Sequence, residues 1–562
     1  MSGKAIMVQG TASHVGKSVL VTALCRILRQ DGLRVAPFKA QNMSLNSYVT
    51  ADGREIARAQ AVQAEAAGVP AEAIMNPILL KPGADSRSQV VVLGQPRGEA
   101  EARQYRERDV PVLARVVEES LRQLLGRFDA VVIEGAGSPA EVNLRDRDLA
   151  NMYVASLADA PVLLVADIDR GGMLAAVVGT LALLEPDERG RVAGLVVNKF
   201  RGDLELLRPG LEFLTRHTGK PVLGVLPYIR ESLVDDEDSV ALDERNTRPG
   251  SAAAAPARTI AARAPTPPGT TSAPGAAPAP RAVICGERPV VAVLRLPRIA
   301  NFTDFAPLES EPGVALRYVP PGRAIGPADA VIIPGSKSTL ADLRWLKAQG
   351  YHREIRALLR QGTPVLGICG GYQMLGLRVA DPVGVDGIAG EEEGLGLLDA
   401  CTVFLPAKET HLVEAEVTGS AGFLEEICHT TLHGYEVHMG TTIRLPGAQP
   451  WLRITRRSNS PADIPEGAVD AAGLVFGTYL HDIFHNDHLR RAFVNWLRRR
   501  RGLPALPEAL DLRAAPDPSA LREKRYDELA RIVRAHLDVE FIYRLLGLTP
   551  RTPTSAPPGR TP

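Results

Sequence analysis

Short apolar runs rich in β-branched residues alternate with amphipathic segments along most of this 562-residue chain, and one long stretch interrupts the alternation. From Arg245 to about Ala282 the sequence turns to Ala, Pro, Thr and Gly, with almost no large apolar residue. Such a stretch cannot bury enough surface to offset the entropy that ordering would cost, so it predicts a flexible linker. Since the chain is also too long for one core, we expect separate folded domains on either side.

The first stretch predicts a parallel β-sheet with helices on both faces. Its strand-like runs are Ala5–Gln9, Arg34–Phe38, Ala130–Glu134, Pro161–Asp167 and Val192–Asn198, and the amphipathic segments between them include Val19–Asp31 and Val112–Gly126. Helical crossovers between parallel strands cover both faces of the sheet.

The second stretch repeats the pattern, becomes richer in β-like segments and ends in a helix. Its strand-like runs include Val290–Arg295, Ala330–Pro334 and Pro364–Cys369, and the final helical segment is Leu529–Leu546. We therefore predict an α/β protein of two doubly wound domains. The predicted bounds are 1–240 for the first domain, 241–286 for the linker, 287–502 for the second domain, and 503–562 for a C-terminal helical extension with a disordered tail.

Composition narrows the cellular setting. The formal net charge is zero, so no overall basic field draws the chain to nucleic acid or to an anionic membrane. The five cysteines are scattered without a C-x-x-C pair, which fits a reducing compartment: Cys25, Cys285, Cys369, Cys401 and Cys428. With no apolar run long enough to span a bilayer, we expect a cytoplasmic protein without nucleic-acid or membrane partners.

The first predicted strand opens into a glycine-containing turn and a helix, which is the arrangement of a phosphate-binding loop. The turn reads GTASHVGKS from Gly10 to Ser18, one residue longer than the common G-x-x-x-x-G-K-[ST] spacing. Backbone N–H groups there would cradle phosphate, Lys17 would reach the β- and γ-phosphates, and Ser18 would bind Mg²⁺. The predicted nucleotide-binding residues in this loop are Gly10, Thr11, Val15, Gly16, Lys17 and Ser18.

Two further strand ends add to the nucleotide site. Glu134 closes an apolar strand and precedes Gly-Ala-Gly, which is where a P-loop protein places its Mg²⁺-side carboxylate. Asn198 closes another buried strand and suits a contact with the nucleotide base. Alternatively, Glu134 only caps its strand and Asn198 only ends one.

A cysteine in the second stretch sits where the backbone must turn sharply. The segment Gly367 to Gly371 reads GICGG between an apolar run and a helix-like one, which is the strand, elbow and helix pattern of a G-x-S-x-G nucleophile with sulfur in place of oxygen. His481, at the end of a later strand, is the candidate base. The turn at Gly335 and Ser336, together with the N–H of Gly370, is the candidate oxyanion hole.

Longer motifs resemble a known family. The GTASHVGKS loop and the EGAG segment at Glu134 look like the dethiobiotin-synthetase type of P-loop ligase. The segments KAQNMS from Lys39, EGAGSPAEVNL from Glu134, DIDRGG from Asp167, NKFRGD from Asn198 and HGYEVH from His433 closely resemble the cobyric acid synthase family. The second half resembles class I glutamine amidotransferases, with their flavodoxin-like sheet, across most of its length.

The resemblance implies a reaction. It implies a ligase that uses ATP and Mg²⁺, takes ammonia from glutamine, and amidates the b, d, e and g carboxylates of adenosylcobyrinic acid a,c-diamide to give cobyric acid. Lys39 would hold the acceptor carboxylate, and Asp52 joins Ser18 and Glu134 as a metal-side candidate. Gln41 and Asn42 either recognise corrin amides and carboxylates or only satisfy their own loop. The oligomeric state stays open.

The same resemblance leaves one role unfilled. Many relatives carry a Glu two residues after the catalytic His, but this chain has Ile483 there, and the cobyric acid synthase branch also lacks that Glu. Asp482 is adjacent to His481, and neighbouring residues on a strand point to opposite faces. We therefore expect a Cys369–His481 dyad or a third group elsewhere.

Two other functions compete with this one. Cobyrinic acid a,c-diamide synthase combines similar modules, but the Lys39–Asn46 and His433–His438 segments favour cobyric acid synthase. A ParA/MinD-like ATPase switch with a degenerate second domain has a similar P-loop, yet such switches usually carry an additional Lys early in the loop, where this chain has Thr11 and Ala12.

Overall fold

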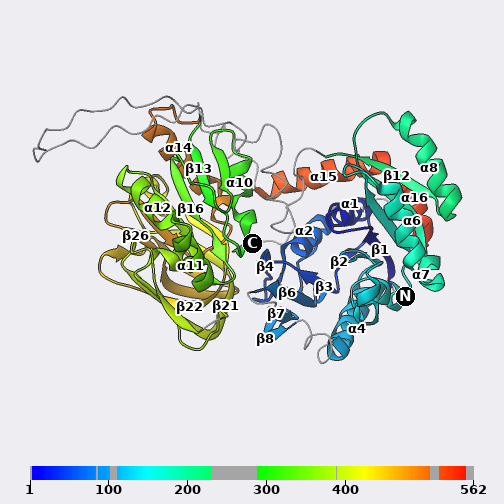
Figure 1. Ribbon diagram of the computed structural model, residues 1–562, viewed down its shortest axis with the longest axis horizontal. Coiled ribbons are helices and arrows are strands. Elements are labelled where there is room, and N and C mark those ends of the chain that lie inside the picture. Colours follow the sequence, from blue (N-terminus) through cyan, green and yellow to red (C-terminus); the bar gives the residue numbers. More distant parts are fainter. Residues whose placement is uncertain are drawn as a thin grey trace, which may run out of the picture. The chain divides into compact units, whose positions relative to one another are not determined.

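The computed structural model describes residues 3–83, 87–101, 110–229, 288–387, 389–506 and 518–551. The predicted linker, the predicted disordered tail beyond residue 551 and Cys285 lie outside the described residues. The described residues form two compact units (Figure 1). The first unit holds residues up to 229 together with 518–551, and the second holds almost all of 288–506.

A six-stranded parallel sheet forms the centre of the first unit. Its strand order is β12-β11-β10-β1-β9-β2. The strands are β1 (Lys4–Gly10), β2 (Val35–Phe38), β9 (Ala130–Glu134), β10 (Val162–Asp167), β11 (Val192–Phe200) and β12 (Val222–Pro227). Because parallel strands end at the same edge, the carboxyl ends of β1, β9 and β11 bring the P-loop, Glu134 and Asn198 to one edge.

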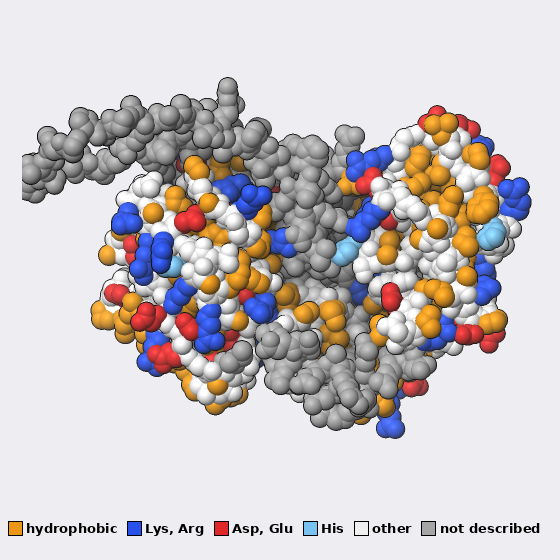
Figure 2. All heavy atoms as spheres, in the orientation of Figure 1, with side chains coloured by type: hydrophobic (Ala, Val, Ile, Leu, Met, Phe, Trp, Pro, Cys, Tyr) orange, Lys and Arg blue, Asp and Glu red, His pale blue; other side chains and the backbone are white. Residues whose placement is uncertain are grey.

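Helices cover both faces of this sheet, as predicted. One apolar core lies under α4 (Val110–Arg127), α5 (Met152–Leu157), α6 (Met173–Leu183) and α8 (Leu204–Thr218). A second core lies under α1 (Lys17–Gln30), α15 (Pro518–His536) and α16 (Val539–Leu546). The short α7 (Pro186–Arg191) precedes β11. Over α8, hydrophobic side chains gather on the surface (Figure 2), where Leu206 is 83% exposed.

The final helices differ from the expectation drawn from chain order. The sequence places Leu529–Leu546 at the end of the second stretch, but α15 and α16 pack beside α1 and β1 in the first unit (Figure 1). Leu529, Val533 and Ile542 are buried there, and Arg26 of α1 pairs with Glu523 of α15. An apolar stripe predicts that a helix packs against a core, but it does not predict which sheet provides that core.

Short strands build a small annex on the first unit. A four-stranded sheet contains β3 (Gln41–Met43), β6 (Ile78–Pro82), β7 (Arg87–Val92) and β8 (Gln95–Glu101), and a hairpin contains β4 (Ser47–Val49) and β5 (Glu55–Ala57). Helix α2 (Arg58–Ala67) follows the hairpin, and nine of its ten residues are buried. The annex carries the segment Lys39–Asn46 beside the main sheet.

The second unit is built on a seven-stranded sheet of order β15-β13-β16-β18-β27-β26-β23. Its strands are β13 (Val290–Leu294), β15 (Ala315–Val319), β16 (Ala330–Ile333), β18 (Val365–Ile368), β23 (Ala448–Gln449), β26 (Ala468–Asp470) and β27 (Val475–Thr478). The five strands from β15 to β27 run parallel; at one side β26 pairs antiparallel with β27, and β23 pairs antiparallel with β26. Its helices include α11 (Thr339–Ala348), α12 (Tyr351–Arg360), α13 (Gly370–Leu375) and α14 (Asp487–Arg500).

The β-rich segment of the second unit forms a separate sheet. Its order is β20-β19-β21-β24-β25, with β22 paired to β21. The strands are β19 (Arg378–Asp381), β20 (Gly390–Glu393), β21 (Ala400–Val417), β22 (Thr431–Arg444), β24 (Leu452–Arg457) and β25 (Ser460–Glu466). The fold of both units is thus the predicted doubly wound α/β class, with this sheet as the addition.

No helix within the described residues is long and apolar enough to cross a bilayer.

Candidate active sites

The loop after β1 has the geometry of a phosphate-binding loop. Gly16 adopts a left-handed φ of 102°, and α1 begins directly after it at Lys17. The Lys17 ammonium donates to the carbonyl oxygens of Ala12 and Gly137, both at 3.0 Å. Lys17 therefore lies across the hollow of the loop, where phosphate oxygens would accept its N–H groups instead.

Neighbouring strand ends hold the loop in shape. The N–H of Thr11 bonds to Val165 of β10 at 2.9 Å, and the Asn198 amide donates to the Val15 carbonyl at 2.8 Å. A side chain on Gly16 would collide with Asn198, at 2.0 Å from its Nδ2. The amide nitrogen of Asn198 is therefore committed to the loop.

Lys199, which is not among the predicted site residues, also stabilises the loop. Its backbone takes a left-handed φ of 60°, and its ammonium bonds both the His14 carbonyl at 2.7 Å and the Asp167 carboxylate at 2.8 Å. Lys199 therefore connects the loop, through the His14 carbonyl, to the Asp167 carboxylate at the end of β10. The adjacent Asn-Lys pair in the sequence is the signal for it.

The predicted metal-side carboxylate and two predicted ligand residues meet at one point. Glu134 is fully buried, and its Oε1 accepts hydrogen bonds from the Ser18 hydroxyl at 2.9 Å and from the Lys39 ammonium at 2.8 Å. A hydroxyl and a carboxylate at the start of α1 supply the hard oxygen donors that Mg²⁺ takes together with phosphate oxygens. The residues present therefore fit Mg²⁺.

The remaining predicted ligands lie apart from this point. Asn42 is buried in β3 and donates to Gln60 of α2 at 2.9 Å, and Gln41 precedes it in the same strand, half-buried. The side chain of Asp52 is 61% exposed in the β4–β5 turn, where it accepts from Thr50 and pairs with Arg54. The carboxylate of Asp52 is thus exposed and already paired within its own turn.

In the second unit, Cys369 occupies the predicted strained elbow. β18 ends at Ile368, α13 begins at Gly370, and Cys369 between them has φ 51° and ψ −110°. A non-glycine residue at positive φ is costly and persists where the fold holds it, which is typical of nucleophile elbows. Gly371 allows the close approach, because a side chain there would lie 2.0 Å from the Ile333 carbonyl.

His481 lies beside the thiol and is held by an aspartate. Its Nδ1 lies 2.7 Å from Asp304 Oδ2, and both side chains are almost completely buried. The other oxygen of Asp304 accepts the backbone N–H of Asp482 at 3.0 Å. Asp304 therefore fills the place that Ile483 leaves open; β27 ends at Thr478, so strand alternation does not govern Asp482, whose backbone adopts a left-handed φ of 62°.

The surroundings of His481 favour its charged form. Burial alone lowers the pKa of the imidazole, but the Asp304 carboxylate and the Cys369 thiol outweigh it and raise the pKa to about 10. The ring also stacks on Tyr435, with centroids 5.1 Å apart. A raised pKa favours the protonated ring, which has a proton to give to a leaving amine.

The predicted oxyanion turn lies against the elbow. A side chain on Gly335 would come within 3.2 Å of the His481 ring and 3.8 Å of Cys369 Cβ, and one on Gly370 within 2.9 Å of the Ser336 nitrogen. The hydroxyl of Ser336 is turned away to Asp342, to which it donates at 2.7 Å. The backbone of the turn, rather than the serine side chain, therefore faces the thiol.

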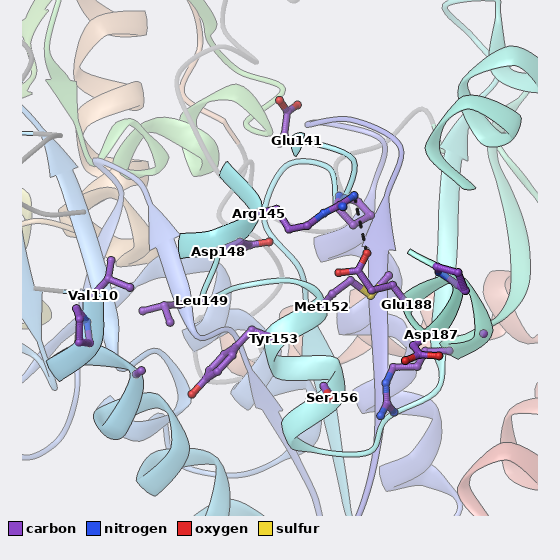
Figure 3. A pocket seen from close by; sticks show the side chains of 16 residues that line it. Val110, Glu141, Arg145, Asp148, Leu149, Met152, Tyr153, Ser156, Asp187 and Glu188 are labelled. Atoms are coloured by element: carbon purple, nitrogen blue, oxygen red, sulfur yellow. Dashed lines mark ion pairs between the residues drawn. The ribbon is translucent and has the colours of Figure 1, made fainter. Parts of the chain in front are cut away.

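A separate cavity of about 890 Å³ opens in the first unit beside the loop after β9 (Figure 3). Its charged lining residues are Glu141, Asp148, Asp187, Glu188, Arg145 and Arg191. Carboxylates outnumber guanidinium groups there, so the lining disfavours an acceptor that carries several carboxylates.

Two family models match this chain, one in each unit. Residues 6–238 match the CobQ/CobB/MinD/ParA nucleotide binding domain, and residues 290–489 match the CobB/CobQ-like glutamine amidotransferase domain. A cobyric acid synthase of Pelotomaculum thermopropionicum is 52% identical over 98% of this chain and 98% of its own length. The chain belongs to the cobyric acid synthase family.

Two other members of the cobyric acid synthase family show the same full-length match. The protein of Desulforamulus reducens is 49% identical over 97% of this chain and 98% of its own, and that of Sorangium cellulosum is 49% identical over 98% of this chain and 100% of its own. The resemblance drawn from the sequence is thus confirmed. As a member of this family the chain is an enzyme, a glutamine-dependent carbon–nitrogen ligase, rather than an ATPase switch.

Proposed function

We propose that this enzyme converts adenosylcobyrinic acid a,c-diamide to cobyric acid by amidating its b, d, e and g carboxylates, with ATP as the energy source and glutamine as the ammonia donor. The observation that carries the proposal is that one chain holds a Cys–His–Asp group in one unit and a P-loop with an acid and a lysine in the other. The full-length relatives named cobyric acid synthase support the substrate.

Ammonia is released in the second unit. The Cys369 thiolate attacks the side-chain amide carbon of glutamine, and the backbone at Gly335, Ser336 and Gly370 holds the oxyanion. His481 gives its proton to the departing nitrogen, so ammonia leaves and a thioester remains. Water then cleaves the thioester to glutamate, with His481 as base, and Asp304 keeps the ring in place throughout.

The acceptor carboxylate is activated in the first unit. Its oxygen attacks the γ-phosphorus of ATP, which forms an acyl phosphate and releases ADP. Lys17 binds the β- and γ-phosphates, and Lys39 stabilises the negative charge between phosphate and acceptor. Ser18 and Glu134 would hold Mg²⁺, which would supply positive charge to neutralise the transferring group. Ammonia then attacks the acyl carbon, giving the amide and phosphate.

The Asn198 amide supports ATP as the nucleotide. Its nitrogen is committed to the Val15 carbonyl, so the oxygen that it presents is an acceptor. Adenine offers an amino group at position 6, whereas guanine offers a carbonyl oxygen that an acceptor repels.

Replacing Cys369 by Ser tests whether ammonia release and carboxylate activation take place in different units. The variant should lose amidation with glutamine but keep amidation with ammonium salts, because only ammonia release requires the thiol. Cys401→Ser, the same change at another free cysteine, should behave as the unmodified enzyme. Equal loss with both nitrogen sources would contradict the proposal.

Mass spectrometry of the product separates the two corrinoid functions. Adenosylcobyrinic acid a,c-diamide should gain four amides. If cobyrinic acid instead gains two amides and the diamide is left unchanged, the chain is a cobyrinic acid a,c-diamide synthase.

A further inference from the structure

The metal-side carboxylate is held by a third group besides Ser18 and Lys39. Glu134 Oε2 accepts a hydrogen bond from the Gln63 side-chain amide at 2.5 Å, on the side of the carboxylate opposite the two other donors. Gln63 and Glu134 are both completely buried. A buried carboxylate takes its orientation from its hydrogen-bond partners, so Gln63 decides which oxygen is turned toward Ser18.

Gln63 is itself part of a line of amides. The Gln60 amide donates to Gln63 Oε1 at 3.4 Å, and the Asn42 amide donates to Gln60 Oε1 at 2.9 Å. Because Gln63 must present its nitrogen to Glu134, its oxygen faces Gln60, and the same order repeats down to Asn42. The line thus runs from the predicted substrate segment Lys39–Asn46 to the carboxylate.

The sequence gives this line no structural reason to be polar. Gln60 and Gln63 are three residues apart on one face of α2, and both are fully buried beside small apolar residues. At such positions a helix normally carries apolar side chains, because buried amides must all find partners. Here every amide in the line points in the direction of Glu134.

We propose that Gln63 is a positioning residue for the Mg²⁺-side carboxylate, and that it sets the Mg²⁺ requirement of nucleotide binding by holding Glu134. This inference rests on the proposed role of Glu134 at the metal. Groups that hydrogen-bond a ligating carboxylate orient it, and their loss typically weakens metal binding by about 10–100-fold. Gln60 acts one step further away, through Gln63.

Gln63→Met removes the donor and keeps the length of the side chain, and Gln63→Asn keeps the amide but withdraws it from Glu134. For both variants, ATP affinity is measured by titration calorimetry at increasing Mg²⁺ concentration. The Mg²⁺ concentration that gives half of the maximal gain in ATP affinity should rise by about 10–100-fold. ATP affinity in excess EDTA should stay unchanged. Gln123→Met, on the exposed face of α4, is the matched control and should shift neither quantity.

Glu134→Gln separates this inference from the proposed function. If Glu134→Gln raises the Mg²⁺ requirement and the Gln63 variants do not, Gln63 does not position the carboxylate and the proposed function stands. If Glu134→Gln itself leaves the Mg²⁺ requirement unchanged, Glu134 is not at the metal, and this inference fails together with the proposed role of Glu134. A loss of ATP affinity that is equal with and without Mg²⁺ would make Gln63 a structural residue and overturn the inference.

Discussion

The imidazole of His481 is held by Asp304 at one ring nitrogen and has Asn301 beside the other. Nδ1 faces Asp304 at 2.7 Å, and Nε2 lies 3.2 Å from the amide nitrogen of Asn301. Asn301 and Asp304 come from one short segment at the start of the second unit, so a single piece of chain sets the direction of the ring. Orientation of a catalytic histidine by a buried acid is the general logic of nucleophile–base–acid triads.

Asp304→Asn should change the pH profile of glutamine hydrolysis. The Asp304 charge raises the pKa of His481 to about 10 against the effect of burial, so its removal lowers that pKa. The imidazolium is then lost at lower pH, and the alkaline limb of the profile moves toward neutral. The rate at neutral pH should fall by about 10²–10⁴-fold.

Asp482→Asn is the control for this prediction. Asp482 sits at a left-handed φ of 62°, which Asn tolerates, and its contact with Asp304 is made by its backbone N–H. Its profile should match that of the unmodified enzyme. An unmoved alkaline limb in Asp304→Asn would show that Asp304 does not control the ring.

The difference between these residues explains what the sequence can predict at this scale. Cys369 and His481 each follow an apolar strand, so their positions in the fold can be inferred from local pattern. Asp304 lies 177 residues before His481, in a short 3-10 segment, Phe302–Phe305, which is preceded only by the two-residue strand β14 (Ile299–Ala300). Its only signal is a polar residue inside an apolar run, which indicates a buried partner without naming it.

At the scale of elements, long periodic segments were predictable and short ones were not. The predicted strand Ala5–Gln9 is β1, Lys4–Gly10, and the predicted helix Val19–Asp31 is α1, Lys17–Gln30. Strands such as β3 and β4 have three residues each and carry polar side chains, so no alternation marks them. They are strands because the annex pairs them, which is a tertiary cause.

Packing of α13 on β16 is the element-level requirement of the elbow. Gly371→Ala would place a methyl group 2.0 Å from the Ile333 carbonyl, and a contact with backbone cannot be relieved by a rotamer change. We expect the second unit to lose about 1–3 kcal/mol or more of unfolding free energy, together with glutamine hydrolysis. Urea unfolding followed by tryptophan fluorescence measures the loss.

Gly179→Ala supplies the matched change in open space. Gly179 lies inside α6 of the first unit with nothing within 4 Å of the added carbon, so this variant should be unchanged or up to about 1 kcal/mol more stable when urea unfolding is followed by far-UV circular dichroism, which reports on both units. An unfolding midpoint for Gly371→Ala equal to that of the unmodified protein would show that the elbow does not depend on this contact.

At the scale of the whole molecule, chain order does not give the composition of each unit. The chain builds the first unit, then the second, and α15 and α16 complete the core of the first. Leu529 and Val533 are buried there among residues of α1. The helix that follows the P-loop is thus covered by the last part of the described chain, which periodicity alone cannot reveal.

Leu529→Ala tests this assignment, because the chain reports on its two units separately. Its three tryptophans, Trp345, Trp451 and Trp496, all lie in the second unit. Removing a buried leucine costs about 2–5 kcal/mol, and since separate units need not unfold together, only the first unit should be weakened. In urea, the far-UV circular dichroism should therefore show an early transition, while the tryptophan fluorescence transition stays in place.

Leu206→Ala, at a side chain 83% exposed on α8, should move neither by more than about 0.5 kcal/mol. A fluorescence transition that shifts with Leu529→Ala, while the dichroism shows no early phase, would instead place α15 in the core of the second unit.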